Sequence, residues 1–284
     1  MKTIVSISEM QKFAERTRLR KKTIGLVATM GSLHQGHVSL ITRAKKSCDV
    51  VVTSIFVNPT QFAPSEDFSR YPRNFARDKK LCESAGVTVL FAPKAESMYP
   101  EGYATYVTVE GLSSVLEGKS RPTHFRGVTT VVAKLLLIVN PDEAFFGQKD
   151  AQQSLVIKKM ARDLNFGTKI VVAPIVRERD GLAMSSRNIY LSPQEREQAT
   201  ILRSSLLQAE MMVKSGKRKT ADVVRERARL IETKPAASID YAAVVHAETL
   251  NEIDTFEPGI PALIALAVRI GKTRLIDNTV ITLH

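Results

Sequence analysis

The chain has 284 residues, of which 44% are hydrophobic and 25% are charged, a composition typical of globular proteins. No apolar run approaches the roughly 18 residues that a membrane-spanning helix needs, and the N-terminus lacks the apolar core of a signal peptide. The sequence therefore predicts a protein with no membrane partner.

The net charge of +12 indicates anionic partners, but the basic residues are dispersed along the chain. They do not interleave with aromatic side chains, so solvated helix faces explain them better than nucleic-acid binding does. Cys48 and Cys82 have no metal-ligand spacing, which is typical of a reducing compartment. We expect a cytoplasmic protein that binds no nucleic acid.

The first elements expected are a helix, a strand and a second helix. An amphipathic pattern predicts a helix over residues 6–21, with Ser6 or Ser8 as its N-cap. A buried strand is expected over 23–28, and a helix over 38–44. Together they predict a strand–turn–helix unit of the kind that binds phosphate in α/β proteins.

Residues 29–37, Thr-Met-Gly-Ser-Leu-His-Gln-Gly-His, form the turn of this unit. Gly31 and Gly36 let the backbone approach a ligand, and the first amides of the helix point at it. His34 and His37 are three residues apart, so on one helical turn their rings share a face and can hydrogen-bond an α-phosphate. The segment has neither the Walker nor the Gly-x-Gly-x-x-Gly pattern. A helix with two surface or capping histidines is the alternative interpretation.

A second buried strand is expected over residues 49–57, whose near-continuous apolar pattern is typical of a central parallel strand. Asn58 and Gln61 follow it. Because parallel sheets bind ligands at the carboxyl edge of their strands, these two residues are candidates for substrate contact. An Asn-Pro segment is also typical of a turn, and both interpretations can hold.

The middle of the chain alternates between expected helices and strands. We expect helices over 74–85, 125–139 and from about 148 to 163, and strands over 87–91, 103–109, 144–147 and 168–173, the last together with Val176. Asp78 either faces a metal ion or, as we expect, is an exposed acid of the first of these helices. Residues 111–127 form a polar loop of the kind that carries function on a rigid scaffold.

Two further segments offer donors to a polyphosphate. Lys149 follows a strand at the start of a helix, although a lysine there is also typical of a solvated surface. Ser185, Ser186 and Arg187 bring two hydroxyls and a guanidinium together, and Gly181 offers a hinge before them. Taken alone, this segment is also compatible with an N-cap and a surface arginine.

The pattern changes after Leu191. Helices are expected over 192–214 and 219–232, followed by strands over 239–245, 262–268 and 279–283. We therefore expect a Rossmann-like, doubly wound parallel α/β sheet over residues 1–175 and a smaller α+β domain over 176–284.

Six motifs in this order resemble those of the pantoate–β-alanine ligase family. They are Thr-Met-Gly-x-Leu-His-x-Gly-His, Ile-Phe-Val-Asn-Pro-x-Gln-Phe, Arg-Tyr-Pro-Arg, Leu-Glu-Gly-x-x-Arg-Pro-x-His-Phe-Arg-Gly-Val, Phe-Gly-x-Lys-Asp-x-Gln-Gln and Met-Ser-Ser-Arg-Asn. The first and last are similar to the HIGH and KMSKS signatures of the nucleotidylyl transferase superfamily. The resemblance is close over 30–188 and continues more loosely to Arg-Leu-Ile-Asp-Asn at 274–278.

This resemblance implies an ATP-dependent condensation of (R)-pantoate with β-alanine, for pantothenate and coenzyme A biosynthesis. ATP and pantoate would form pantoyl adenylate and pyrophosphate, and the amine of β-alanine would then expel AMP. It also implies Mg²⁺ on the polyphosphate without an assigned protein ligand, Asp78 being at most an indirect support. A homodimer and a C-terminal domain that lids the active site are further implications.

The resemblance also assigns residues to roles. His37 is the expected proton donor, and His34 would help to stabilise the α-phosphate transition state; Lys149, Ser185, Ser186 and Arg187 complete the expected catalytic set. Gln61, Gln153 and Asn58 are the expected contacts of pantoate and β-alanine. The expected ATP contacts are Met30, Gly31, Ser32, Leu33, His34, Gln35, Gly36, His37, Gly147, Gln148, Lys149, Asp150, Val176, Met184, Ser185, Ser186 and Arg187.

Two positions depart from the family pattern. Ala28 stands where proline is frequent, which should loosen the turn slightly, and Ala151 stands where an aromatic residue is common, which should alter packing beneath Gln153.

Two other functions compete with this one. A related adenylyl or cytidylyl transferase for another small acid is disfavoured by the Gln61 and Gln153 motifs. A basic RNA-binding module or tRNA synthetase fragment is disfavoured by the dispersed charge and the lack of stacking aromatics.

Overall fold

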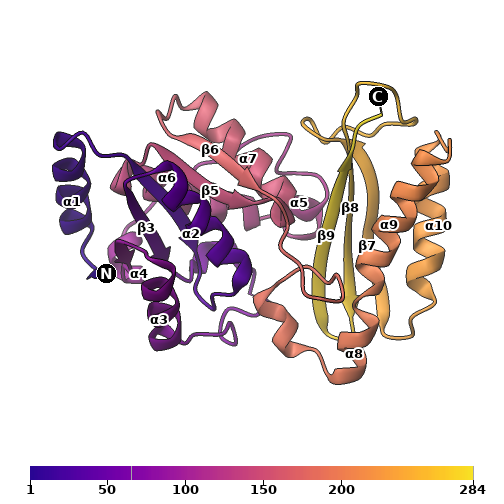
Figure 1. Ribbon diagram of the computed structural model, residues 1–284, viewed down its shortest axis with the longest axis horizontal. Helices are drawn as coiled ribbons and strands as arrows, with labels where there is room; N and C mark the ends of the chain where they lie inside the picture. Colours follow the sequence, from indigo (N-terminus) through magenta and orange to yellow (C-terminus); the bar gives the residue numbers. More distant parts are fainter. Residues whose placement is uncertain (65, 284) are drawn as a thin grey trace. The chain divides into compact units, whose positions relative to one another are not determined.

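The computed structural model describes residues 1–64 and 66–283, which form two compact units (Figure 1). The first unit contains residues 1–148 and 152–174. The second contains residues 149–151 together with the chain from 175 onward. Within the described residues, we find no helix with the length and apolar character needed to cross a bilayer.

The first unit is built on a six-stranded sheet in which every strand pairing is parallel. Its spatial order is β1 (Lys2–Ile4), β4 (Val89–Phe91), β3 (Val50–Ile55), β2 (Ile24–Thr29), β5 (Glu143–Gly147) and β6 (Lys169–Ala173). The helices of this unit are α1 (Ile7–Leu19), α2 (Gln35–Ser47), α3 (Phe75–Ala85), α4 (Ala95–Met98), α5 (Glu117–Ser120), α6 (His124–Val139) and α7 (Ala151–Asp163). The Rossmann-like α/β prediction is confirmed.

Apolar side chains cover both faces of this sheet. Successive residues of a strand point to opposite faces, so Ile24 and Leu26 of β2 join the core formed with α1 and α6, whereas Val27 faces α2 and α3. This double covering is why the central strands have near-continuous apolar sequences.

The strand order reverses between β2 and β5. These two strands are neighbours in the sheet, although β3 and β4 separate them in the sequence. Ligands of doubly wound sheets bind at the carboxyl ends of the strands beside such a reversal. The loop after β2 carries residues 30–34, and β5 ends at Gly147, before the 3-10 turn η2 (Gln148–Asp150).

The second unit packs helices on an antiparallel sheet, which confirms the α+β prediction. Its helices are α8 (Pro193–Gln198), α9 (Ile201–Lys214) and α10 (Thr220–Glu232), and its strands are β7 (Ala237–His246), β8 (Ala262–Ile270) and β9 (Thr273–Ile281), in the order β7-β8-β9. Figure 1 shows α9 and α10 beside this sheet.

The strand expected over 103–109 was wrong. These residues form no regular element and pair with no strand in the part of the chain that the structure describes. Instead, the Val107 amide donates to Thr130 Oγ1 at 3.0 Å, and Thr129 Oγ1 donates to the Val107 carbonyl at 2.6 Å. The alternating pattern therefore comes from a segment that packs on α6.

The last strand starts earlier than predicted, at Thr273 rather than at residue 279. Asp277 and Asn278 interrupt its apolar pattern, yet both are buried within it because other side chains and backbone groups satisfy them. The helix expected over 192–214 is divided into α8 and α9, and β6 ends at Ala173, so Val176 lies outside it.

Candidate active site

A buried carboxylate holds the loop that follows β2. Asp78, in the first turn of α3, accepts hydrogen bonds from the amides of Ser32 at 2.7 Å and Leu33 at 2.9 Å. Its exposed fraction is 1%, so the expectation of an exposed helical acid was wrong. Ser32 has a φ of +51°, a conformation that costs a non-glycine residue free energy, and the two bonds from this loop to Asp78 oppose that cost.

His34 and His37 both cap the N-terminus of α2. Nδ1 of His34 accepts from the Gly36 amide at 3.1 Å, and Nδ1 of His37 accepts from the His34 amide at 3.3 Å. The ring centroids are 4.2 Å apart, so the predicted shared face is confirmed. A side chain at Gly36 would place its Cβ 2.8 Å from the His34 ring, which explains the glycine.

This capping fixes the tautomer of each neutral ring. Because Nδ1 of each ring accepts a backbone hydrogen bond, the proton of a neutral ring lies on Nε2. The two histidines therefore place two N–H groups at the positive end of a helix dipole, an arrangement that suits a phosphate.

The side chain of Gln61 is held by the amide of Asn58. Asn58 Nδ2 donates to Gln61 Oε1 at 3.0 Å and to the Gly127 carbonyl at 3.1 Å. Asn58 Oδ1 accepts from the Tyr99 hydroxyl at 2.8 Å and from Thr60 Oγ1 at 3.0 Å. Asn58 is 1% exposed, so its side-chain amide binds protein groups rather than a ligand. Because Gln61 Oε1 accepts from Asn58, the Nε2 group of Gln61 is the part of its amide that can donate to a ligand.

The close packing of α6 on the 3-10 turn η1 (Pro59–Gln61) explains a second glycine. A Cβ on Gly127 would lie 2.4 Å from the Thr60 carbonyl oxygen and 2.6 Å from Gln61 Cα, both backbone atoms that have little room to move. Glycine is therefore required for the carbonyl of residue 127 to reach Asn58.

Arg121, Glu66 and His124 surround the backbone of Gln61. Arg121 donates to Glu66 Oε1 at 2.6 Å and Oε2 at 2.7 Å, and His124 Nδ1 lies 3.0 Å from the Gln61 carbonyl. Burial opposes ionisation of Glu66, but the bonds and charge of Arg121 outweigh it and lower the pKa of this carboxyl. Burial, aided by the charge of Arg121, lowers the pKa of His124 to about 4, so this imidazole is neutral near pH 7 and donates from Nδ1.

Gln152 fixes the polar loop between residues 111 and 117. Its Nε2 donates to the carbonyls of Leu112 at 2.8 Å and Val115 at 2.7 Å, and its Oε1 accepts from the Glu117 amide at 3.0 Å. The expected substrate contact Gln153 is the next residue of α7, and it is half-buried.

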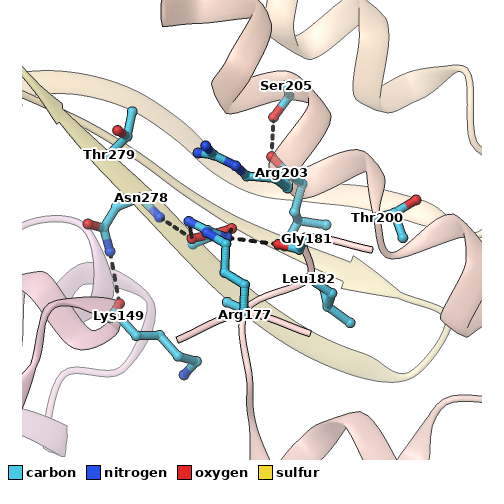
Figure 2. A network of polar contacts seen from close by, with 12 residues as sticks. Lys149, Arg177, Gly181, Leu182, Thr200, Arg203, Ser205, Asn278 and Thr279 are labelled. Atoms are coloured by element: carbon cyan, nitrogen blue, oxygen red, sulfur yellow. Dashed lines mark hydrogen bonds and ion pairs between the residues drawn. The ribbon is translucent and has the colours of Figure 1, made fainter. Parts of the chain in front are cut away.

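The second unit contains the other predicted phosphate-binding residues. Lys149 Nζ lies 3.7 Å from Asp150 Oδ1, and the Lys149 carbonyl accepts from Asn278 Nδ2 at 2.9 Å (Figure 2). Ser185 caps the 3-10 turn η3 (Ser186–Tyr190) by accepting from the Arg187 amide at 3.2 Å, as the N-cap interpretation proposed.

The predicted residues therefore divide between the units. Met30 to His37, Asn58, Gln61, Gly147, Gln148 and Gln153 belong to the first unit, and Lys149, Asp150, Val176 and Met184 to Arg187 belong to the second. Sequence reasoning missed Tyr99, which no motif marked, and the burial of Asp78. In the described parts of the chain, no three His, Cys, Asp or Glu residues gather into a metal-binding group.

We expect His124 to make the protein less stable in acid. Its pKa falls from 6.5 to about 4 on folding, so below pH 6.5 the unfolded chain binds the proton first. The stability that its neutral form contributes is complete above pH 6.5 and declines toward pH 4, by about 3 kcal/mol in all. Urea unfolding at pH 7 and pH 4.5 should therefore show a smaller acid-induced loss for His124→Gln than for the wild type. An equal loss in both proteins would contradict this role of His124.

Comparisons with known proteins show which family this chain resembles. A model of the family described as pantoate-beta-alanine ligase matches residues 2–280. Pantothenate synthetase of Acetivibrio thermocellus is 53% identical over 281 residues, which cover 99% of each chain.

Two solved structures are also similar. Pantothenate synthetase of Thermus thermophilus has a TM-score of 0.92 and 45% identity, covering 98% of this chain and 99% of that one. Pantoate-beta-alanine ligase of Francisella tularensis, whose structure is described as complexed with beta-gamma ATP and beta-alanine, has a TM-score of 0.78 and 34% identity, covering 98% and 97%. This chain therefore belongs to the pantoate–beta-alanine ligase family of pantothenate-forming enzymes.

Proposed function

We propose that the enzyme activates (R)-pantoate with ATP as pantoyl adenylate and then transfers the pantoyl group to β-alanine. The observation that carries this proposal is the pair of backbone-anchored imidazoles at the N-terminus of α2, beside the reversal in strand order. The Francisella relative, described with an ATP compound and β-alanine, supports the same pair of substrates.

The α-phosphate of ATP would lie against the loop after β2 and the first turn of α2. There the Nε2–H groups of His34 and His37 would donate to the oxygens that gain negative charge as pantoate attacks. His37 is the proposed proton donor of this pair. Residues 30–36 would contact the rest of the nucleotide through their backbone, which Asp78 holds in place.

Pantoate would bind to the donor group of Gln61. Since Asn58 occupies Gln61 Oε1, Gln61 Nε2 is oriented as a donor toward a carboxylate or hydroxyl oxygen. Gln153 is the proposed second contact. We assign Asn58 a positioning role rather than direct contact, because its own amide is fully engaged with protein groups.

Lys149 and Arg187 would offset the charge of the triphosphate, and the hydroxyls of Ser185 and Ser186 would donate hydrogen bonds to it. The further ATP contacts would be Gly147, Gln148, Asp150, Val176 and Met184. Mg²⁺ would enter with ATP, as part of the substrate. Because ATP activates the carboxylate and the amine of β-alanine attacks it, no protein nucleophile is needed, and catalysis is orientation and charge stabilisation.

The two domains, residues 1–175 and 176–284, would have different roles in substrate binding. Residues 1–175 would bind pantoate and the adenylyl part of ATP, and 176–284 would supply most phosphate contacts and close over them. We further propose a cytoplasmic homodimer; the free, buried thiols of Cys48 and Cys82 support a reducing compartment.

The purified protein should release pyrophosphate from ATP and Mg²⁺ only when pantoate is present. Addition of β-alanine should then yield AMP and pantothenate in equal amounts, because the adenylate is consumed by the amine. A coupled pyrophosphate assay with pantoate omitted is the control. Pyrophosphate release that does not depend on pantoate, from folded protein, would refute the proposed substrate.

Removing the Tyr99 hydroxyl should weaken pantoate binding specifically. In Tyr99→Phe the Asn58 amide loses one fixed partner, so Gln61 is oriented less well, and we expect KM for pantoate to rise about 5- to 10-fold, which corresponds to one hydrogen bond. KM for ATP should stay within about twofold, because the hydrogen bonds of the Tyr99 hydroxyl among the described residues join it to Asn58 and Thr60 rather than to the loop after β2.

Tyr103→Phe is the matched control. Tyr103 belongs to the same aromatic cluster, with its ring centroid 5.0 Å from that of Tyr99, but it makes no hydrogen bond to Asn58 among the contacts of the described residues. Steady-state kinetics of both variants would decide the point. Equal effects on the KM values for pantoate and ATP in Tyr99→Phe would mean a general loss of structure.

A further inference from the structure

Two consecutive polar residues are buried in β9 without a role in the proposed chemistry. Asp277 is 2% exposed and Asn278 is 3% exposed. A buried carboxylate and amide cost free energy unless the fold satisfies them. Their partners therefore show what these residues accomplish.

Asn278 holds the turn that contains Lys149. Its Nδ2 donates to the Lys149 carbonyl at 2.9 Å (Figure 2). Its own backbone amide donates to Asp277 Oδ1 at 2.8 Å. The Lys149 carbonyl belongs to η2, at a bend between β5 and α7 where regular backbone pairing is interrupted. The Asn278 amide thus fixes the backbone from which the Lys149 side chain extends.

Asp277 holds a second segment through Arg177. Arg177 Nη1 donates to Asp277 Oδ2 at 2.6 Å, and Nη2 donates to Oδ1 at 3.0 Å. This bidentate ion pair is stronger and more directional than a single hydrogen bond. Arg177 Nη1 also donates to the Gly181 carbonyl at 3.0 Å, as Figure 2 shows. Gly181 has a φ of +93° and lies in the turn of a tight hairpin.

This hairpin leads directly into the Met184–Arg187 segment. Arg177 pairs with Ala183 across it, and the Met184 amide donates to the Val176 carbonyl at 3.0 Å. The following turn, η3, lies against β9. The two phosphate-binding segments of the second unit are therefore attached to neighbouring residues of one strand.

The charge around Asp277 reinforces this arrangement. Arg227 of α10 is fully buried, and burial lowers its pKa to about 10 while the nearby Asp277 carboxylate opposes that shift. Its Nε, Nη1 and Nη2 atoms have no hydrogen-bond partner among the described residues, so its attraction to Asp277 is purely Coulombic. Asp277 thus interacts with two guanidinium groups, through hydrogen bonds with Arg177 and through charge alone with Arg227.

We propose that Asp277 and Asn278 are positioning residues that set the spacing between Lys149 and the Met184–Arg187 segment for adenylyl transfer. This inference rests on the proposed function, because it assigns both segments to the ATP phosphates. Since pyrophosphate has left before β-alanine attacks, the pair governs the first half-reaction and has little influence on the second.

Asn278→Asp tests the proposal most sharply. The variant keeps the size of the side chain but directs a carboxylate oxygen at the Lys149 carbonyl in place of the donor. Pantoate-dependent pyrophosphate release should fall at least tenfold. The reaction of β-alanine with supplied pantoyl adenylate should stay within twofold of the wild type. Comparable losses in both half-reactions, or no loss in either, would overturn the proposal.

Thr279→Val is the matched control. It removes one hydrogen bond on the same strand, from Thr279 Oγ1 to Glu210 Oε1 at 2.9 Å, without touching either phosphate-binding segment. Both half-reactions should keep their rates in this variant, and a selective loss of the first one there would overturn the proposal.

Asn278→Ser, which loses the bond without adding charge, is assayed in parallel so that a folding defect of Asn278→Asp does not decide the outcome. It should show the same selective loss, and unchanged pyrophosphate release in folded Asn278→Ser would overturn the proposal. A wild-type protein that releases no pantoate-dependent pyrophosphate would refute the proposed function itself, which separates the two failures.

Discussion

The side-chain amide of Asn58 joins two neighbouring groups of the chain, on Thr60 and Gln61, to two distant ones, on Tyr99 and Gly127. It donates to Gln61 Oε1 and to the Gly127 carbonyl, and it accepts from Tyr99 and Thr60. Thr60 and Gln61 belong to η1, whereas Gly127 lies on α6 and Tyr99 follows α4. A side-chain amide can bind all four groups because it has two N–H donors and an acceptor oxygen. The close approach of α6 at Gly127, the conformation of η1 and the orientation of Gln61 all depend on it. A buried side chain thus positions the residues at the edge of the sheet where we propose that pantoate binds.

The same device recurs in the other loops. Asp78 holds the amides after β2, Gln152 holds the loop before α5, and Asn278 holds the carbonyl of Lys149. Two of these loops contain a non-glycine residue in the left-handed region, Ser32 at +51° and Leu116 at +46°. Such conformations persist where surrounding bonds over-determine them. A ligase that works by orientation needs loops whose backbone is already in place when the substrates arrive, and buried polar side chains provide this without occupying the substrate site.

The elements that sequence reasoning placed correctly are those with a strong period or a clear terminus, such as the central strands and α3 with Gly86 after it. Asn58, Gln61, His34 and His37 could be proposed because they follow apolar strands. Asp78 could not be recognised as buried, since an acid in a first helical turn has the same local pattern whether solvent or a loop covers it. The start of β9 was missed for a related reason, because Asp277 is buried through partners 100 residues away in the sequence. Tyr99 matched no motif, and its role emerges only when α4 and η1 are placed together in space.

If buried side chains preorganise the loops that are proposed to receive substrate, loosening the Asp78 contacts in Asp78→Asn should weaken ATP binding. The substitution keeps the size of the side chain but replaces one of the two acceptors of the Ser32 and Leu33 amides with a donor. ATP affinity is measured calorimetrically without pantoate, so that no turnover occurs, once with Mg²⁺ and once with EDTA. We expect the variant to fold and to bind ATP at least tenfold more weakly, by the same factor in both conditions. Unchanged ATP affinity in EDTA would contradict this role of Asp78, because the carboxylate would then act through the metal ion or not at all.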